Sequence, residues 1–144
     1  MWGGGWYWEK YKDFFVEKGY RCHTPYLRYH DVDPKAGPDS RLATTSLLDY
    51  AQDLEDFIKE KELNEKPILM GHSMGGLLAQ ILGAREVASA LVLLTPAPPS
   101  GIFALKFSVI KTFWPVLFKR RFWKEPYILP LKNAVYGMMH LMSG

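Results

Sequence analysis

Hydrophobic and polar positions along this chain follow two periods, and these periods predict two kinds of element. Three segments carry apolar side chains three or four positions apart, the spacing of one face of a helix: 6–18, 46–63 and 74–84. Three shorter runs are strand candidates: 20–27, which is broken only by Pro25, 67–70 and 87–94. Helices and strands therefore alternate along the first two thirds of the chain.

Two of the predicted helices also carry end signals. Gly19 directly follows the first helix, as a C-terminal glycine often does. Thr45 or Ser46 can cap the second helix, because a short hydroxyl side chain accepts from the free N–H groups of the first turn. We expect the second helix to bury one apolar face, made of Leu47, Tyr50, Ala51, Leu54, Phe57 and Ile58.

The order of the elements predicts the fold class. Alternating strands and helices favour a parallel sheet with right-handed crossovers, so we expect an α/β core over residues 6–97. Segment 87–94 is almost continuously apolar, which is typical of a central parallel strand buried on both faces. The Pro- and Gly-rich segment 96–101 ends this pattern. Beyond it we expect a second, mainly helical unit over residues 101–144.

One motif is more informative than any other part of the chain. A short apolar run leads into Gly71-His72-Ser73-Met74-Gly75, and a helical pattern follows. A strand, a sharp turn and a helix in that order hold a serine hydroxyl clear of the backbone. We expect Gly71 and Gly75 to be required, because a side chain at either position would collide with the closely passing strand or helix. At the start of the helix, the backbone N–H of Met74 can point at a developing oxyanion.

This motif, continued by Gly76, resembles the nucleophile elbow of the α/β-hydrolases, in the form found among serine esterases, lysophospholipases and related acyl hydrolases. Segment 6–21 resembles the family's first helix and the strand after it, and segment 91–97 resembles the strand after the elbow helix. The resemblance implies that Ser73 is the catalytic nucleophile and that Met74 supplies an oxyanion N–H. It also implies that residues 101–144 are a helical cap or lid segment.

The residues that should assist the serine are missing from their expected places. A serine nucleophile needs a general base and an orienting acid, and in this family both follow the serine. After Ser73 the chain has no Asp, and its only Glu and His residues are Glu86, Glu125 and His140. None of them follows an apolar strand, and His72 diverges from its neighbour in the turn. We therefore expect a fragment that carries the elbow, lacks the base and the acid, and is inactive alone.

The implied chemistry requires no metal ion and no organic cofactor, and we expect neither. His30, Asp31 and Asp33 are three metal-ligand types close together. Their surroundings are rich in Pro, Gly and Asp, which is turn chemistry, and no other ligand cluster stands near them in the sequence. The segment is therefore interpreted as a loop.

Cysteine usage and hydropathy bear on the compartment. Cys22, the single cysteine, excludes an internal disulfide, and its place in a predicted strand fits a buried structural thiol. This usage fits a reducing compartment, and we expect a cytoplasmic location. Residues 1–20 lack the features of a signal peptide. No charge-free apolar stretch of about 18 residues predicts a membrane span.

The net charge of +3 conceals an asymmetry between two parts of the chain. Residues 1–100 hold 11 Lys/Arg and 14 Asp/Glu, whereas residues 101–144 hold 7 and 1. Within 102–124 the basic residues alternate with Phe and Trp. This mixture fits either a helical cap with a solvated basic face or peripheral contact with an anionic lipid surface. No nucleic-acid partner is expected, because no recognised motif accompanies the charge.

Together these features predict a serine hydrolase that cleaves carboxylic esters of small, lipid-like or amphiphilic acyl substrates through an acyl-enzyme on Ser73. Two alternatives use the same fold, since fold alone does not fix function. One is a non-catalytic module that binds a small molecule or a lipid. The other is haloperoxidase-like or dehalogenase-like chemistry; a dehalogenase would place Asp at the nucleophile position, and Ser73 argues against that.

Overall fold

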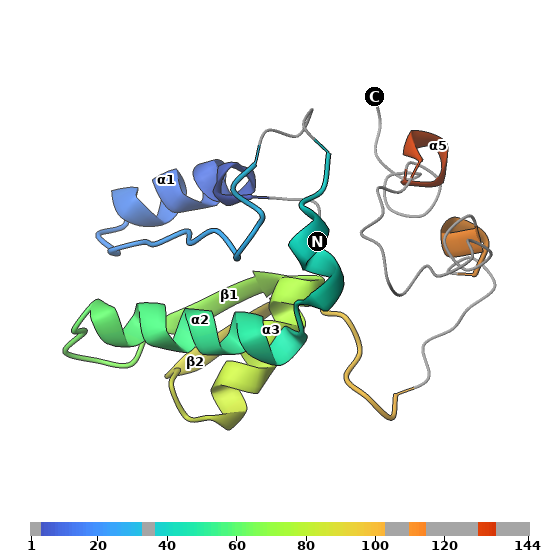
Figure 1. The fold of residues 1–144 in the computed structure, drawn as a ribbon. Helices are drawn as coiled ribbons and strands as arrows, with labels where there is room; N and C mark the ends of the chain where they lie inside the picture. Colours follow the sequence, from blue (N-terminus) through green and yellow to red (C-terminus); the bar gives the residue numbers. More distant parts are fainter. Residues whose placement is uncertain (1–3, 33–36, 103–109, 115–129, 135–144) are drawn as a thin grey trace.

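The computed structural model describes residues 4–32, 37–102, 110–114 and 130–134. Its elements, in chain order, are η1 Gly5–Trp8, α1 Glu9–Glu17, η2 Ser40–Thr44, α2 Leu47–Glu60, β1 Ile68–His72, α3 Met74–Ala84, β2 Ala90–Leu94 and α5 Leu131–Ala134. Figure 1 shows α2 and α3 close to the two strands, with α1 set apart from them.

The centre of the fold is the unit β1–α3–β2. The two strands are parallel and pair in register from Ile68 with Ala90 to His72 with Leu94. Two parallel strands need a crossover between them, and α3 supplies it. The structure therefore confirms the predicted α/β class in a partial form, a small parallel sheet with flanking helices.

Small residues let α3 lie close to the strands, and α2 then packs on α3. A β-carbon at Gly83 would lie 2.8 Å from Cδ1 of Leu91, which shows how closely α3 approaches β2. Tyr50 and Ala51 of α2 form a buried cluster with Leu78 of α3. These three buried side chains join α2 to the β1–α3–β2 unit.

The start of α2 is set by Ser46, one of the two caps that the sequence offers. Its hydroxyl accepts the backbone N–H of Asp49 at 3.1 Å, and the Asp49 carboxylate accepts the backbone N–H of Ser46 at 2.7 Å. This reciprocal pair is a capping box. The helix ends at Glu60, three residues earlier than predicted, and Leu47 of the expected buried face is exposed.

The predicted strand over residues 20–27 is wrong. This segment is irregular and pairs with no strand in the described part of the chain. Pro25 has no N–H to contribute to a ladder. Gly5 of η1 is buried so close to the segment that a β-carbon there would lie 3.0 Å from the carbonyl oxygen of Thr24. Cys22 is accordingly half-buried in a loop, not a core thiol in a sheet.

The first helix forms where predicted, but its apolar face is not buried. The chain enters through the 3-10 turn η1, and Gly19 follows the helix with φ +86°, a conformation that favours glycine. No residue of α1 is buried. Among the described elements α1 contacts only η1.

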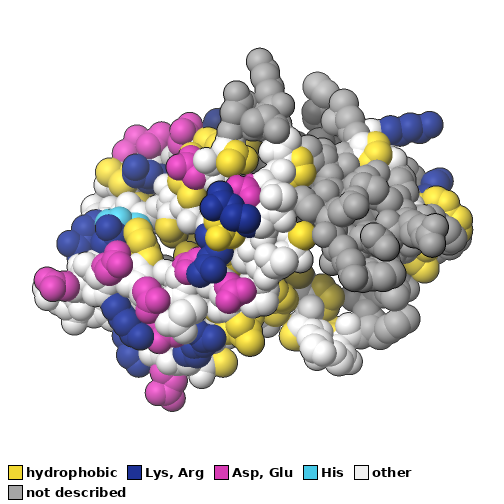
Figure 2. All heavy atoms as spheres, viewed as in Figure 1, with side chains coloured by type: hydrophobic (Ala, Val, Ile, Leu, Met, Phe, Trp, Pro, Cys, Tyr) yellow, Lys and Arg dark blue, Asp and Glu magenta, His cyan; other side chains and the backbone are white. Residues whose placement is uncertain are grey.

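The expectation that segment 87–94 forms a strand buried on both faces is also wrong for the strand observed there, β2. Leu91 and Leu93 of β2 each retain 37% exposure, and Ile68 of β1 retains 56%. In the described sheet each strand has one neighbour, so one edge of each strand is open. Figure 2 shows hydrophobic side chains open to view between mixed acidic and basic ones.

Most of the predicted cap segment lies outside the described residues, so the division at about residue 100 stays a prediction. Residues 110–114 are helical, and α5 forms one further turn. The amide nitrogen Nδ2 of Asn133 donates to the carbonyl oxygen of Lys111 at 3.5 Å, which brings these two pieces together. In the described ranges, no helix combines the length and the apolar character that crossing a bilayer demands.

Candidate functional site

Ser73 occupies the sharp turn between β1 and α3, where the chain reverses direction. Its backbone has φ 54° and ψ −118°. A residue with a β-carbon rarely adopts positive φ, and such conformations persist only where surrounding contacts impose them. Half-buried Ser73 is thus held in a strained conformation at the carboxyl end of β1, the edge of a parallel sheet where ligands usually bind.

Backbone hydrogen bonds to the end of β2 and the residues after it fix this turn. The N–H of Ser73 donates to the carbonyl oxygen of Leu94 at 3.1 Å. The carbonyl oxygen of Ser73 accepts from the N–H groups of Gly76 at 3.0 Å, Leu77 at 3.2 Å and Ala97 at 2.9 Å. The strained residue is therefore held from both sides, by the first turn of α3 and by the segment that follows β2.

Two glycines make the turn sterically feasible, and only one of them was predicted. A β-carbon on Gly71 would lie 2.2 Å from the carbonyl oxygen of Gly75, which no real structure tolerates. A β-carbon on Gly76 would lie 2.8 Å from Cβ of Pro96. At Gly75 nothing described lies within 4 Å of such an atom, so the prediction that a side chain there would collide is wrong. Gly75 matters through its backbone, which Gly71 must accommodate.

Met74 is the first residue of α3, and its backbone N–H is one of the donors that a helix leaves without an intrahelical partner. In the described part of the chain this N–H donates to no backbone acceptor. The helix dipole adds partial positive charge at the same place. The Met74 side chain packs against the buried cluster around Tyr50, and Leu27 and Leu42 pack there too. The core of the fold therefore fixes the position of this N–H.

His72, beside the serine, is engaged elsewhere. Its ring stacks on the ring of Tyr7 with centroids 5.7 Å apart and planes inclined by 20°. This contact joins η1 to the end of β1.

The other histidines of the described residues have partners of their own. His23 lies edge-on to Phe57 with ring centroids 6.0 Å apart, and burial and nearby cations lower its pKa. His30 contacts the ring of Tyr50, and its Nδ1 lies 3.0 Å from the carbonyl oxygen of Arg28.

No described contact brings a candidate acid, Glu86 or Glu125, or the remaining candidate base, His140, to Ser73. Glu86 is exposed and follows α3 with φ 59°. Glu125 and His140 lie outside the described residues. The structure thus places the predicted nucleophile and its neighbouring N–H together. No described contact joins a base or an acid to them.

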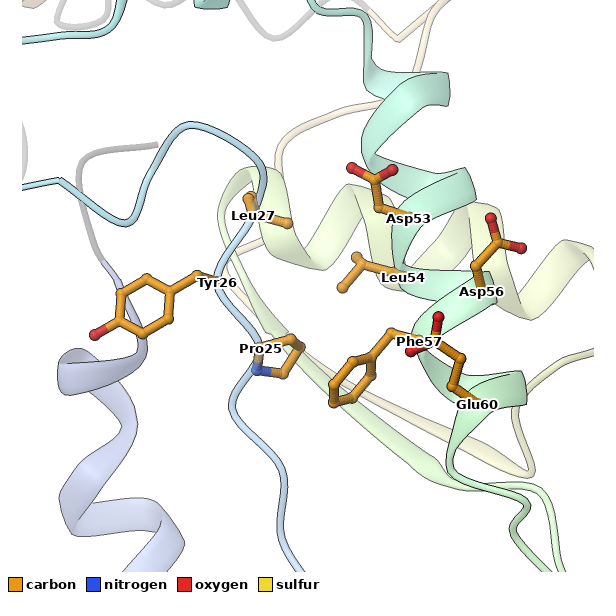
Figure 3. A pocket seen from close by; sticks show the side chains of 8 residues that line it. All are labelled: Pro25, Tyr26, Leu27, Asp53, Leu54, Asp56, Phe57 and Glu60. Atoms are coloured by element: carbon orange, nitrogen blue, oxygen red, sulfur yellow. The ribbon is translucent and has the colours of Figure 1, made fainter.

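A pocket of about 390 Å³ lies between residues 25–27 and one side of α2. Figure 3 shows Pro25 and Leu27 facing α2 across it, while the ring of Tyr26 points away. The α2 side of the pocket comprises Asp53, Leu54, Asp56, Phe57 and Glu60. Ser73 does not line this pocket, so it is separate from the turn.

Beside this pocket, Arg28 and Asp53 form a two-pronged ion pair that the sequence did not indicate. Nε and one terminal nitrogen of the Arg28 guanidinium donate to the two carboxylate oxygens of Asp53. The hydrogen bonds to this carboxylate raise the pKa of Arg28. The pair ties the irregular segment to α2. Because the two residues are 25 positions apart, no local pattern reveals their contact.

Metal ligation has no evident place among the described residues, where no group of three His, Cys, Asp or Glu side chains could hold an ion. At the turn itself, the groups described are the Ser73 hydroxyl and the backbone N–H of Met74.

Comparison with known proteins relates the chain to a family and to a curated protein. A model of the "Alpha/beta hydrolase family" matches residues 1–140. "Putative esterase/lipase 2" of Mycoplasma pneumoniae (strain ATCC 29342 / M129 / Subtype 1) is 30% identical, with 68% of this chain and 46% of that protein covered. The chain thus spans about half the length of this curated relative. No solved structure matches the chain significantly.

Proposed function

This chain belongs to the alpha/beta hydrolase family, and from that premise we propose that Ser73 is the nucleophile of an enzyme that hydrolyses carboxylic esters. The observation that carries the proposal is the backbone of Ser73, with φ 54° at the turn from β1 to α3. Strain at a single residue held by surrounding contacts is characteristic of functional sites. In this proposal the turn is a nucleophile elbow.

The proposed reaction proceeds through an acyl-enzyme. Oγ of Ser73 attacks the ester carbonyl carbon while a general base takes the hydroxyl proton. The Met74 N–H then donates to the oxyanion of the tetrahedral intermediate. Collapse breaks the bond to the alcohol, which leaves with a proton returned by the base. Water then attacks the acyl-enzyme with the help of the same base, releasing the carboxylic acid and restoring the serine.

In this proposal, the 144 residues supply the nucleophile, and the general base and the orienting acid lie outside them. Within the described ranges, the histidines contact other aromatic rings, and Glu86 is exposed. A serine hydroxyl without a base is a weak nucleophile. We therefore assign ester hydrolysis to the complete protein, and to this chain alone only slow acylation.

The proposed substrates are lipid-like or amphiphilic acyl esters. Segment 102–124 supports this choice, because its Lys and Arg residues alternate with Phe and Trp. A segment of this composition can contact both an acyl chain and an anionic headgroup. The printed name of the Mycoplasma relative, an esterase/lipase, agrees with this class.

A second candidate is a non-catalytic module that binds an acyl ligand at the same place. It is favoured by one observation, the engagement of His23, His30 and His72 with aromatic rings away from the serine hydroxyl. Such a module would bind its ligand without forming a covalent bond to Ser73.

A fluorophosphonate probe distinguishes the two functions, because it forms a covalent bond with activated serines. We expect mass spectrometry to find one adduct, on Ser73, after prolonged incubation with excess probe. Ser73→Ala should abolish the adduct, and Ser100→Ala, at an exposed serine outside the turn, should not change it. Binding of a fluorescent fatty acid without any adduct on Ser73 would favour the binding module.

A further inference from the structure

A second residue beside the turn has a left-handed backbone. Thr95 directly follows β2 and has φ 40°. Positive φ is rare for a β-branched residue, and a residue before a proline is normally extended. Thr95 is β-branched and precedes Pro96, so its surroundings impose this conformation. His72 of β1 pairs with Leu94 of β2. The residues that follow this pair, Ser73 and Thr95, are thus both strained, at the same edge of the sheet.

The hydrogen bonds around Ser73 explain why the chain bends at Thr95. In a regular parallel ladder, a residue donates its N–H to one residue of the neighbouring strand and accepts at its carbonyl from the residue two positions further on. The N–H of Ser73 donates to the carbonyl oxygen of Leu94 at 3.1 Å, so the ladder requires an N–H from residue 96. Residue 96 is a proline, which has none. The N–H of Ala97 donates to the Ser73 carbonyl instead, at 2.9 Å.

The missing N–H therefore adds one residue to the segment opposite the serine. Thr95 and Pro96 both lie between the two bonds to Ser73, where a regular ladder has a single residue. An extra residue of this kind is a β-bulge, which bends its strand and is common beside active sites. The bend also sets Pro96 against the first turn of α3, where a β-carbon on Gly76 would lie 2.8 Å from Cβ of Pro96. Residues 95–97 thus contact the turn twice, through a hydrogen bond and through Pro96.

We propose that Thr95 and Pro96 are positioning residues for Ser73. Pro96 withholds an N–H, which moves the donor for the Ser73 carbonyl to Ala97, and Thr95 makes the bend that this move requires. The displaced bond holds Ser73 at its positive φ and so keeps its hydroxyl clear of the backbone. The effect on reactivity rests on the proposed role of Ser73 as the nucleophile, whereas the effect on the hydrogen bonds does not.

Amide hydrogen exchange, followed by NMR, tests the hydrogen bonds. Pro96→Ala restores the N–H that the regular ladder needs and keeps the β-carbon that lies against Gly76. In the unaltered chain the amide of Ala97 should be protected from exchange. In Pro96→Ala the new amide at position 96 should become protected, and the amide of Ala97 should lose its protection. An Ala97 amide that stays protected in Pro96→Ala would overturn the proposal.

The backbone of Thr95 has its own test. Thr95→Gly should keep the amide of Ala97 protected and should raise the urea midpoint of unfolding, because glycine adopts positive φ without strain. Glu62→Gly is the matched control, since Glu62 is also exposed and has φ 46° but lies in the turn after α2. It should raise the midpoint similarly. A midpoint that falls in Thr95→Gly while it rises in Glu62→Gly would overturn the role given to Thr95.

The rate at which a fluorophosphonate labels Ser73 tests the consequence for reactivity. Pro96→Ala should lower this rate roughly tenfold, the fold-change that corresponds to the strain of one such residue. Pro98→Ala, the same substitution two positions further on, should leave both the rate and the protection of Ala97 unchanged. Equal rates in Pro96→Ala and the unaltered chain would overturn the proposal. If no form of the chain is labelled at Ser73, the proposed function is wrong, and hydrogen exchange then decides on Thr95 and Pro96 by itself.

Discussion

Gly71 and Gly75 lie so close that a β-carbon on the first would be 2.2 Å from the carbonyl oxygen of the second. The strand before Ser73 and the helix after it therefore meet through bare backbone. The contact is one-sided, because nothing described lies within 4 Å of a β-carbon placed on Gly75. The two glycines of the Gly-x-Ser-x-Gly motif thus have different physical roles.

Substitution of these glycines should give opposite results. Gly71→Ala should lower the free energy of unfolding by about 3 kcal/mol, because the backbone atoms it meets cannot move aside. Gly75→Ala should raise the free energy of unfolding by about 0.5 kcal/mol, because alanine is more stable than glycine inside a helix. Urea unfolding followed by circular dichroism measures both. Equal losses of stability in the two variants would contradict this account. They would show that a cause other than the Gly71 contact makes the turn intolerant of a side chain at both positions.

The capping box of α2 should make part of the stability depend on pH. The backbone N–H and the hydroxyl of Ser46 both donate to the Asp49 carboxylate, and these bonds lower the pKa of Asp49 below its ordinary value of 3.8. A lowered carboxyl pKa contributes stability that is fully present above the ordinary value and is lost as the pH falls from that value through the lower pKa of the folded state. Thermal unfolding between pH 5 and pH 3 should show the beginning of this loss.

Two variants isolate the contribution of this cap. Asp49→Asn should flatten the pH dependence between pH 5 and pH 3, although Asp39 and Glu55, whose pKa values are also lowered, still contribute. Ser46→Ala should cost about 1 kcal/mol at neutral pH, the usual value of an N-cap. Thr45→Ala is the control, because its hydroxyl donates to Arg41 and does not cap α2. An unchanged pH profile in Asp49→Asn would contradict the assignment.

Hydrolysis of p-nitrophenyl esters should separate the complete protein from this chain. In the complete protein, Ser73→Ala should lower kcat by about three orders of magnitude or more, to the rate that binding and oxyanion stabilisation supply. The 144-residue chain should already turn over near that low rate, and His140→Ala should not change it. Strong activity in the isolated chain, lost in both variants, would instead identify His140 as the base.

Segment 102–124 should bind anionic vesicles more tightly than neutral ones, and added salt should weaken this binding. Replacing Lys119, Arg120 and Arg121 together by Gln should weaken it about a hundredfold, at roughly 1 kcal/mol for each charge near an anionic surface. Vesicle co-sedimentation measures the difference. Equal binding to both vesicle types would leave a cap with a solvated basic face.

The parts of the fold that the sequence predicts well are those with local causes. The bounds of α3 agree with the predicted helix at both ends, because Ser73 and the apolar spacing after it define it locally. Helix α1 also ends where Gly19 indicates. The sequence does not decide between Thr45 and Ser46, because both are good cap residues, and only the backbone path determines which hydroxyl meets the free N–H.

The parts that the sequence does not predict depend on distant partners. Residues 20–27 have a strand-like composition, but a strand forms only beside another strand, and in the described part of the chain this segment packs against Gly5 of η1 instead. The ion pair of Arg28 with Asp53 likewise depends on tertiary structure. At the candidate site, the proposed nucleophile and its neighbouring N–H have a local signature. A base and an acid from distant segments have none.

The hydrogen bonds between Ser73 and residues 94–97 link the conformation of the serine, and with it the reactivity we propose for it, to a small part of the fold. Positive φ at Ser73 costs free energy, and the bonds to Leu94 and Ala97 help to offset it. If the end of β2 frays, the serine can relax to an ordinary conformation while the cluster around Leu78 stays packed. On warming, the serine would then lose its reactive geometry before the chain unfolds, and the melting of this corner, not of the core, would set the working temperature.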